Sequence, residues 1–500
     1  MILFHGKKPE SSERGIALIV ALMLLLLFSA ALMGMIMMSN TETNVSANFR
    51  DEQTAFFASK AAVEEVRDRL RSTATNSLNS SIPTTALPGA ANGVVYITNP
   101  ASGETVTPWL PLGTNYPDTE ICKEVTCTNG VPTGTWYATP QSASTSYATA
   151  PILPWKWVRV MAKANQSVTG TASVTSVDGQ TNGNRVCWSG TNEIATTAAS
   201  CPAVNVNANY QPVYELTALA VTSSGSRRMT QYEVTRTAFP GIPGAFVFDG
   251  SNPSFNVPHS NPFAVSGTDV AQGPTAGVGC ATGVNQPALG SFDNPAVSTL
   301  TAAVTANPDR SGNYTSGSSP TPAISNAYST LSSGSINLTT VDGLTKLVNS
   351  ITAAASANVY PGGTTPTNMG TNSAPVINVV QGDLSLSGSG AGILLVTGQL
   401  TLNGAFSYNG IILAIGKGAI VKSGGGSATV NGAMFAANLY GDVPPTYTNL
   451  IPLGTNHAPG IPYFGWSGGG SATIQYDSCW ISAVTQTLPF NIVAQRELIY

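Results

Sequence analysis

The sequence has few charged side chains. It contains 21 basic and 25 acidic residues, which together make up 9% of the chain, against about a quarter in an average protein. Sixteen of them occupy positions 1–72. The net charge of −4 leaves no basic surface for nucleic acid. Recurring Val, Ile, Leu and aromatic residues among Thr, Asn and Gly favour extracellular β-structure over disorder.

Residues that bind metals or catalyse reactions are also scarce. There is no CxxC motif, and none of the three histidines lies near a cysteine pair: His5, His259 and His457. We therefore expect no metal and no cofactor. Residues 375–440 contain only three charged residues, Asp383, Lys417 and Lys422, too few and too separated for an acid–base pair. The glycines of 423–426 precede no helix, so they predict no phosphate loop. The chain is not expected to be an enzyme.

Six cysteines are consistent with an oxidising compartment. Cys122 and Cys127 enclose four residues, and Cys187 and Cys201 enclose thirteen. Both spacings are easily closed, so we expect two local disulfides. Whether the two remaining cysteines, Cys280 and Cys479, form a third disulfide stays open.

The longest apolar run in the chain covers positions 16–38. It carries no charge, and it exceeds the roughly 20 residues that a helix needs to span a bilayer. The leader, residues 1–15, contains Lys7, Lys8 and Arg14. Under the positive-inside rule the N-terminus stays cytoplasmic and the rest lies outside. We expect a single pass through a membrane.

The junction between leader and apolar run has a distinctive order of residues. Arg14-Gly15-Ile16 is followed by the apolar run, with the glycine before it. This resembles the prepilin junction of type IV pilins. The resemblance implies that prepilin peptidase cuts between Gly15 and Ile16 and that Ile16 becomes the N-methylated first residue. The alternative is a signal anchor that is never cut.

A second segment strengthens the resemblance. Residues 48–62 read N-x-RD-x-Q-x-AF-x-A-x-x-A, about thirty residues after the RG-x-ALIVAL start. Both halves resemble the PilX N-terminal family of minor pilins, closely over residues 10–72. The resemblance implies other pilin subunits, prepilin peptidase and the inner membrane as partners, with a pilus tip adhesin as a further candidate.

One position departs from major pilins. Their fifth mature residue is a glutamate that compensates the N-terminal ammonium of a neighbouring subunit, whereas this chain has Val20. An unpaired charge inside a membrane is costly. A subunit without the glutamate therefore suits the tip, where no subunit sits above it. The PilX-type family and the tip pseudopilin of type II secretion share this lack.

The helix is expected to continue over residues 16–72 and to end near Arg71. Apolar residues recur at helical spacings and predict a face that packs on a head: Val45, Phe49, Phe56, Val63, Val66 and Leu70. Residues 73–240 are predicted to form a β-rich head. A half-buried strand is expected over 155–161, and a hairpin is expected between 213–221 and 228–234. Five tryptophans are expected in its core, with a sugar-binding surface as the alternative: Trp109, Trp136, Trp155, Trp157 and Trp188.

Residues 240–244, PGIPG, indicate a domain boundary. After it come short strand patterns, and similar segments begin at positions 393, 411 and 433, which gives separations of 18 and 22. Short strands with glycine corners and a period near twenty predict a parallel β-helix over 241–500. Residues 285–372 are expected to be a largely helical or loop insertion, and 465–500 a final strand and cap.

The predicted fold is therefore α+β and mainly β, with a long pilin-like transmembrane helix, an antiparallel β-rich head and a C-terminal parallel β-helix. The favoured function is a minor pilin or tip component that supports pilus assembly and surface attachment or aggregation. Two alternatives remain. One is a tip pseudopilin of type II secretion, and the other is an uncut membrane-anchored adhesin.

Overall fold

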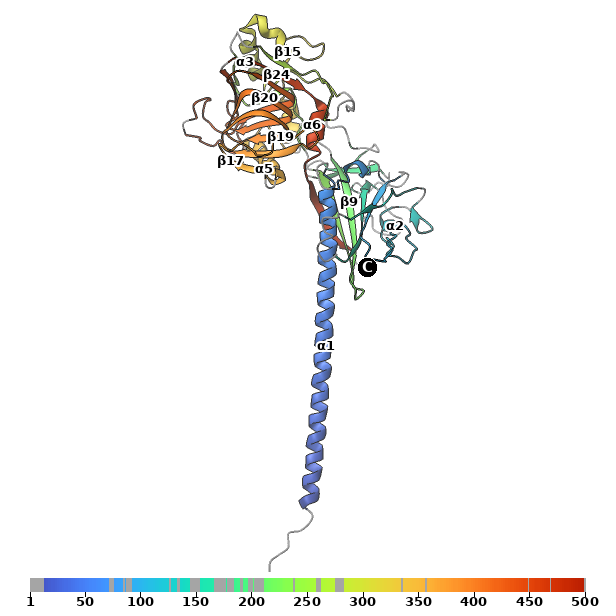
Figure 1. Ribbon diagram of the computed structural model, residues 1–500. Helices are drawn as coiled ribbons and strands as arrows, with labels where there is room; N and C mark the ends of the chain where they lie inside the picture. Colours follow the sequence, from blue (N-terminus) through green and yellow to red (C-terminus); the bar gives the residue numbers. More distant parts are fainter. Residues whose placement is uncertain are drawn as a thin grey trace, which may run out of the picture.

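A long helix and two globular parts make up the molecule (Figure 1). The computed structural model describes residues 13–71, 76–83, 86, 92–125, 127–132, 135–143, 153–165, 177, 184–188, 192–196, 201, 211–236, 239–257, 262–274, 283–333, 336–355, 358–447, 449–467 and 469–498. We call the part built from residues 76–236 and 490–498 the head, and the part built from 239–485 the second part. Each has its own buried apolar core.

Helix α1 (Glu13–Arg69) is continuous. Its 57 residues span about 85 Å at 1.5 Å per residue. The helix ends two residues before the predicted Arg71. Its last four turns bury a face of small and branched side chains against the head sheet: Ala55, Ala58, Ala62, Val63 and Val66.

The head sheet has the strand order β25-β10-β9-β5-β1-β4. These strands are β1 (Val94–Thr98), β4 (Gln141–Ser142), β5 (Trp155–Ala162), β9 (Gln211–Val221), β10 (Arg227–Arg236) and β25 (Phe490–Leu498). All neighbours are antiparallel except β1 and β4. The predicted hairpin is confirmed, since β9 pairs with β10 from Arg227 opposite Val221.

Smaller elements complete the head. They are η1 (Asn79–Ser81), α2 (Ile121–Glu124), β2 (Cys127–Thr128), β3 (Val131–Pro132), β6 (Ala164–Asn165), β7 (Asn184–Trp188) and β8 (Glu193–Ala195). Strand β5 was expected to be half-buried, but all of its residues except Lys156 are buried. The reason is that it lies between β1 and β9, with α1 on one face and a second apolar cluster on the other.

Three of the five tryptophans occupy the core of the head, as the core interpretation predicts. Trp136, Trp155 and Trp157 are buried. Trp109 and Trp188 are half-buried, and Trp109 stacks on the ring of Tyr137 beside the second apolar cluster.

The last strand of the chain lies in the head, which the sequence did not predict. The expected cap over 465–500 divides in two. Helix α6 (Ser478–Thr485) packs on the second part, whereas β25 returns to pair with β10 as the edge strand of the head sheet. Arg236 lies opposite Phe490, so both connections between the two parts leave the head at the same point.

The second part is built on one 14-stranded sheet whose strands pair in parallel, with the main order β12-β23-β21-β20-β22-β11-β14-β16. It includes β18 (Val376–Gln381) and the three longest strands, β19 (Leu384–Val396), β20 (Gln399–Gly416) and β22 (Ser427–Asn438). The shorter strands are β11 (Phe246–Asp249), β12 (Ser254–Asn256), β13 (Phe263–Ser266), β14 (Leu289–Ser291), β15 (Tyr314–Thr315), β16 (Ile324–Asn326), β17 (Val359–Pro361), β21 (Ala419–Ser423), β23 (Tyr463–Ser467) and β24 (Ser471–Tyr476).

The predicted spacing of repeated segments matches the pairing. Ile393 lies opposite Ile411, and Ile411 lies opposite Ala433, so the separations of 18 and 22 are those of paired residues. Neighbouring residues on these strands face opposite sides. Leu394 is in the inner cluster, whereas Leu395 packs beneath α5 (Val341–Ala355) and α6. Burial on both faces explains the continuous apolar runs.

Residues 285–372 contribute more strands to the parallel sheet than predicted. The expected helices are present as α3 (Asn294–Thr305), α4 (Tyr328–Ser333) and α5, and a 3-10 helix, η3 (Pro308–Asn313), follows α3. However, four strands of this segment join the parallel sheet: β14 before α3, β15 and β16 between the helices, and β17 after α5. The idea of an insertion that only packs on the sheet is therefore wrong. Strands this short cannot show a recognisable alternation in sequence.

Candidate membrane anchor and assembly helix

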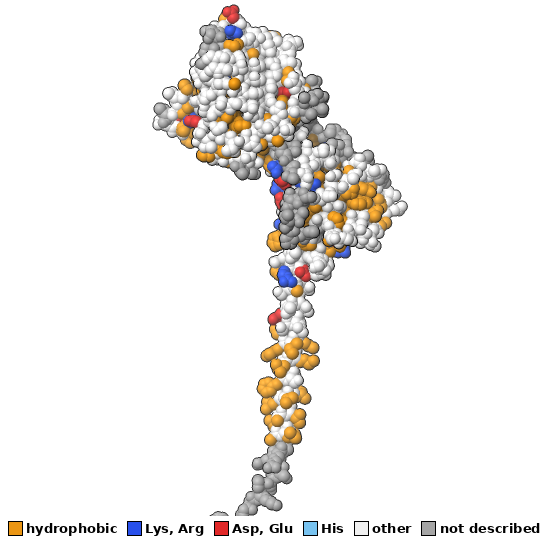
Figure 2. All heavy atoms as spheres, viewed as in Figure 1, with side chains coloured by type: hydrophobic (Ala, Val, Ile, Leu, Met, Phe, Trp, Pro, Cys, Tyr) orange, Lys and Arg blue, Asp and Glu red, His pale blue; other side chains and the backbone are white. Residues whose placement is uncertain are grey.

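The first half of α1 is fully exposed and apolar. The segment from Ile16 onwards reaches a mean hydropathy of 2.9, and none of that window is buried. Figure 2 shows this half as a column of hydrophobic side chains below the head. It is the one helix in the described part of the chain that is long and apolar enough to cross a membrane. This is compatible with a membrane anchor, although a signal sequence meets the same criterion.

The residues predicted at the processing site lie at the start of this helix. Gly15 and Ile16 are within its first turn, and Val20 follows one turn later. The side chains of Ile16 and Val20 are 64% and 50% exposed. Positions four apart in a helix share a face, so Val20 is adjacent to Ile16 on the helix surface.

Polar contacts fix the upper half of α1 to the head. Arg228, near the tip of the β9–β10 hairpin, forms ion pairs of 3.0 Å with Glu52 of α1 and with Glu497 of β25. Arg67 donates a 2.5 Å hydrogen bond to the backbone oxygen of Phe490. The helix, the hairpin and the C-terminal strand are thereby held together.

The packed face of α1 is shorter than the sequence predicted. Val63, Val66 and Leu70 are buried as expected, but Val45 and Phe49 are 62% and 61% exposed. Apolar packing of the helix against the head begins only at Ala55, one turn after the ion pair between Glu52 and Arg228. Val45 and Phe49 thus extend the exposed apolar surface beyond the predicted membrane span.

Both predicted local disulfides are present. Cys122 is bonded to Cys127 and Cys187 to Cys201, with Cα–Cα distances of 5.5 and 5.8 Å. Cys479 is also disulfide-bonded. Its candidate partner, Cys280, lies outside the described residues. The first disulfide closes the loop that carries α2 over the head sheet.

Beneath this loop lies a buried ionic cluster that the sequence analysis missed. Arg159 on β5 donates to the carboxylates of Asp118, at 2.7 Å, and Glu124 on α2. Gln231 on β10 donates to Glu124 at 2.6 Å and accepts a hydrogen bond from Arg496 on β25. The loop before α2, α2 itself, β5, β10 and β25 thus each contribute a side chain to one buried cluster. Burial opposes the charge of Arg159, but the two carboxylates outweigh it and raise its pKa.

Glu215 on β9 extends the cluster. Its side chain is fully buried, and neither carboxylate oxygen accepts a hydrogen bond from the described residues. Burial, and then the charge of Glu124, raise the pKa of Glu215 well above its ordinary value of 4.5. A neutral Glu215 can donate its proton to Glu124. Charged residues inside apolar strands, Arg159 in WKWVRVM and Glu215 in VYELTALAV, were the signal that could have indicated this cluster.

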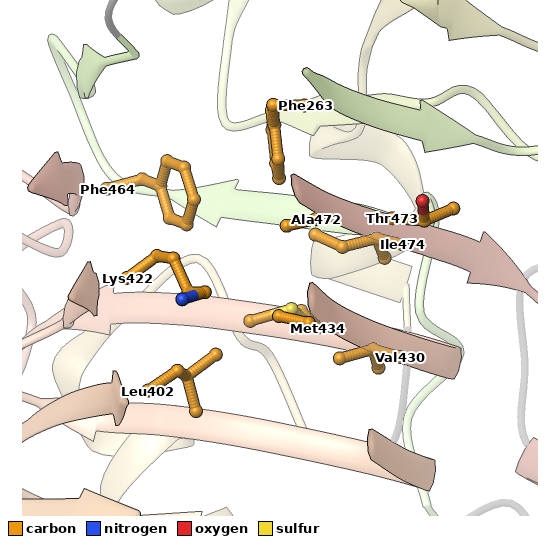
Figure 3. Close-up of a pocket in the computed structure, with 10 residues that line it drawn as sticks. Phe263, Leu402, Lys422, Val430, Met434, Phe464, Ala472, Thr473 and Ile474 are labelled. Atoms are coloured by element: carbon orange, nitrogen blue, oxygen red, sulfur yellow. The ribbon is translucent and has the colours of Figure 1, made fainter. Parts of the chain in front are cut away.

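The three charged residues of 375–440 make structural contacts. Asp383 and Lys417, which the sequence suggested were separate, form a surface ion pair of 2.8 Å. Lys422 points to the inner face of the sheet, where Figure 3 shows it between Leu402 and Phe464. It donates to the carbonyl oxygens of the two residues that follow it, and burial lowers its pKa. The cavity beside it has room for one water molecule at most.

Among the described residues, no group of three or more His, Cys, Asp or Glu side chains has the arrangement of a metal site. His457 lies on an exposed loop. His5 and His259 lie outside the described residues.

Comparisons with protein-family models, with curated proteins and with solved structures found no match.

Proposed function

We propose that this chain is a PilX-type minor pilin or pilin-like tip component of a type IV pilus. The observation that supports this most is the two-part character of α1. Its first half is apolar and exposed on all sides, and its last turns pack on a β-sheet head. Such a helix can exchange a lipid environment for a bundle of similar helices, because both surround it with apolar surface.

The proposed route begins in the inner membrane, with the N-terminus cytoplasmic. Prepilin peptidase removes the leader after Gly15, and Ile16 becomes the methylated first residue. The helix then joins other pilin subunits. Val45 and Phe49, which are 62% and 61% exposed, are available for contacts between helices outside the membrane.

Val20 supports a position at the tip. A subunit that lacks a carboxylate here cannot neutralise the N-terminal ammonium of a subunit above it. Leaving that charge unpaired in a low-dielectric bundle is costly. The same residue favours the second candidate, a tip pseudopilin of type II secretion.

The second part is proposed to be a parallel β-helix displayed at the far end of the molecule. Ile377 lies opposite Ile393, Ile393 opposite Ile411, and Ile411 opposite Ala433. Each step along the sheet therefore covers a similar length of chain, as expected for successive coils. We infer that this part is presented for surface attachment or aggregation, with a pilus tip adhesin as a further candidate partner.

Mass spectrometry of the mature N-terminus, with and without prepilin peptidase, tests the proposal. The expected product begins at methylated Ile16 and depends on the peptidase. An intact Met1 in both strains contradicts the pilin mechanism and leaves an uncut anchored adhesin. Co-purification with sheared pili or with secretion-system pseudopilins then separates the two pilin-like functions.

A further inference from the structure

One outer surface of the second part is regular and uncharged. It is formed by residues 388–391, 405–409, 427–431, 471–475 and 263–266, which pair in parallel in this order. None of these residues is charged. We call this surface the ladder face.

The outward side chains of the ladder face are short and mostly polar. One row consists of Ser389, Ser407, Thr429, Thr473 and Ala264, each opposite the next. A second row consists of Asn409, Asn431, Gln475 and Ser266. All are exposed or half-exposed, whereas the residues between them, such as Tyr408, Val430 and Ile474, are buried inside. Because adjacent strands are about 4.8 Å apart, each row repeats at that interval.

A sequence repeat maintains these rows. Residues 423–431 read SGGGSATVN and residues 467–475 read SGGGSATIQ. Although far apart in sequence, the two segments lie on adjacent strands, with Ser427 opposite Ser471 and Thr429 opposite Thr473. The repeat therefore places the same hydroxyl groups at successive steps of the face.

Hydrogen bonds along the rows orient the side chains in advance. Asn431 donates to Asn409 at 2.9 Å, and Asn409 donates to Asn372 at the same distance. Ser471 donates to Ser427 at 3.0 Å. Side chains already held in one rotamer lose little entropy when a ligand binds.

These properties exclude most kinds of ligand. Nucleic acids and anionic polymers need basic residues, and protein partners are usually anchored by Trp, Tyr or Arg, none of which points outward here. Small molecules need a concave site, whereas this surface is one side of a sheet. The remaining match is a flat, uncharged ligand with regularly spaced hydroxyl groups.

We propose that the ladder face binds the ordered surface of a neutral polysaccharide. Rows of hydroxyl and amide groups exchange hydrogen bonds with the hydroxyls of parallel sugar chains, and neither surface has to desolvate a charge. The inference rests on the surface-attachment part of the proposed function and names its ligand class. Because the contact does not involve α1, it can be tested without filament assembly.

Cosedimentation of the purified full-length chain, in detergent micelles, with microcrystalline cellulose and with chitin tests this inference. We expect binding to at least one of them that persists at high salt, because no charges take part. Thr429→Glu combined with Thr473→Glu should weaken binding about tenfold or more, since burying unpaired carboxylates is costly. Ser298→Glu with Thr305→Glu on α3 adds the same charge elsewhere and should bind like the wild type.

A milder variant tests whether weaker binding could result from misfolding of the glutamate variant. Ser407→Ala with Thr473→Val removes two hydroxyls without adding charge, and should bind more weakly while keeping the circular dichroism spectrum of the wild type. Three results would each overturn the proposal. They are no binding to either glycan, an equal loss of binding in the α3 control variant, and incorporation of the protein into growing ice without glycan binding. N-terminal processing is measured separately, so its failure is distinguishable.

Discussion

Three glycines occupy the same corner of successive strands in the second part. Gly392, Gly410 and Gly432 have φ angles of +136°, +127° and +135°, a region that other residues rarely adopt. A Cβ atom on Gly410 would lie 2.2 Å from the backbone oxygen of Gly392. Glycine is therefore required at position 410 both by the backbone angle and by the close approach of the neighbouring strand β19.

Gly410→Ala should destabilise the second part by on the order of 3 kcal/mol, since strain and the steric clash add. Urea unfolding followed by the fluorescence of the tryptophans measures the loss. Gly425→Ala is the matched control, because nothing lies within 4 Å of the added Cβ atom. Equal stability of both variants would contradict the conclusion that position 410 requires glycine.

Glu215 makes the head sensitive to pH. Because its pKa is higher in the folded state than the ordinary 4.5, the folded chain binds more protons above that pH than the unfolded chain does. The free energy of unfolding therefore falls as the pH rises from 4.5 towards the raised pKa. Glu215→Gln should remove the contribution of Glu215 to this fall and be more stable than the wild type at neutral pH.

Denaturant titrations at several pH values measure the difference. The gap between the variant and the wild type should close once the pH falls below the ordinary pKa of a glutamate. Glu52→Gln, at a carboxylate that is 54% exposed, is the control for loss of a negative charge at the surface. The same slope in wild type and Glu215→Gln would exclude the buried carboxyl as its source.

Residue-level prediction worked where partners are near in sequence. The disulfides close spans of 5 and 14 residues, so spacing alone was sufficient. Arg159 meets Asp118 and Glu124 across 41 and 35 residues, and no local pattern connects them. The cluster was therefore visible only as charges placed inside apolar strands.

Among the elements, α1 was the most predictable and β25 the least. A long uncharged run determines a helix by itself, whereas β25 depends on β10, from which the whole second part separates it in sequence. Its exposed, mixed sequence, FNIVAQREL, shows no clean alternation. Tertiary pairing, not local propensity, makes it a strand.

Removal of residues 490–500 should destabilise the head by several kcal/mol, because β10 loses its edge partner and Glu124 and Gln231 lose the contact with Arg496. Hydrogen exchange of the β10 amides should accelerate strongly. Amides of β20 in the second part serve as the internal reference and should be unaffected. Unchanged protection of β10 would show that the strand is dispensable.

At the scale of the whole molecule, the separations of 18 and 22 residues between paired segments were readable from sequence, but the order of strands was not. Strand β11 lies between β22 and β14, so the segment that comes first in the second part sits in the middle of the stack. The period of the sequence pattern indicates that repeats stack, but it does not indicate which repeats are neighbours in the sheet.

The Val20 hypothesis also belongs to the whole molecule. Val20→Glu supplies the carboxylate needed beneath another subunit, so the variant should appear along the filament shaft as well as at its end. Immunogold electron microscopy with antibody against the head measures this distribution. Val20→Leu should keep the wild-type location, and shaft labelling already present in the wild type would contradict a tip position.

The placement of β11 and β25 has a consequence for the proposed export across the inner membrane. Strand β11 pairs with β22, and β10 pairs with β25. In each globular part, an early strand therefore lacks a partner until a strand much later in the sequence has been exported. Contacts of such long sequence separation form slowly. The chain must therefore cross as far as β25 before the head can finish folding, and until then its unpaired strand edges need protection from aggregation.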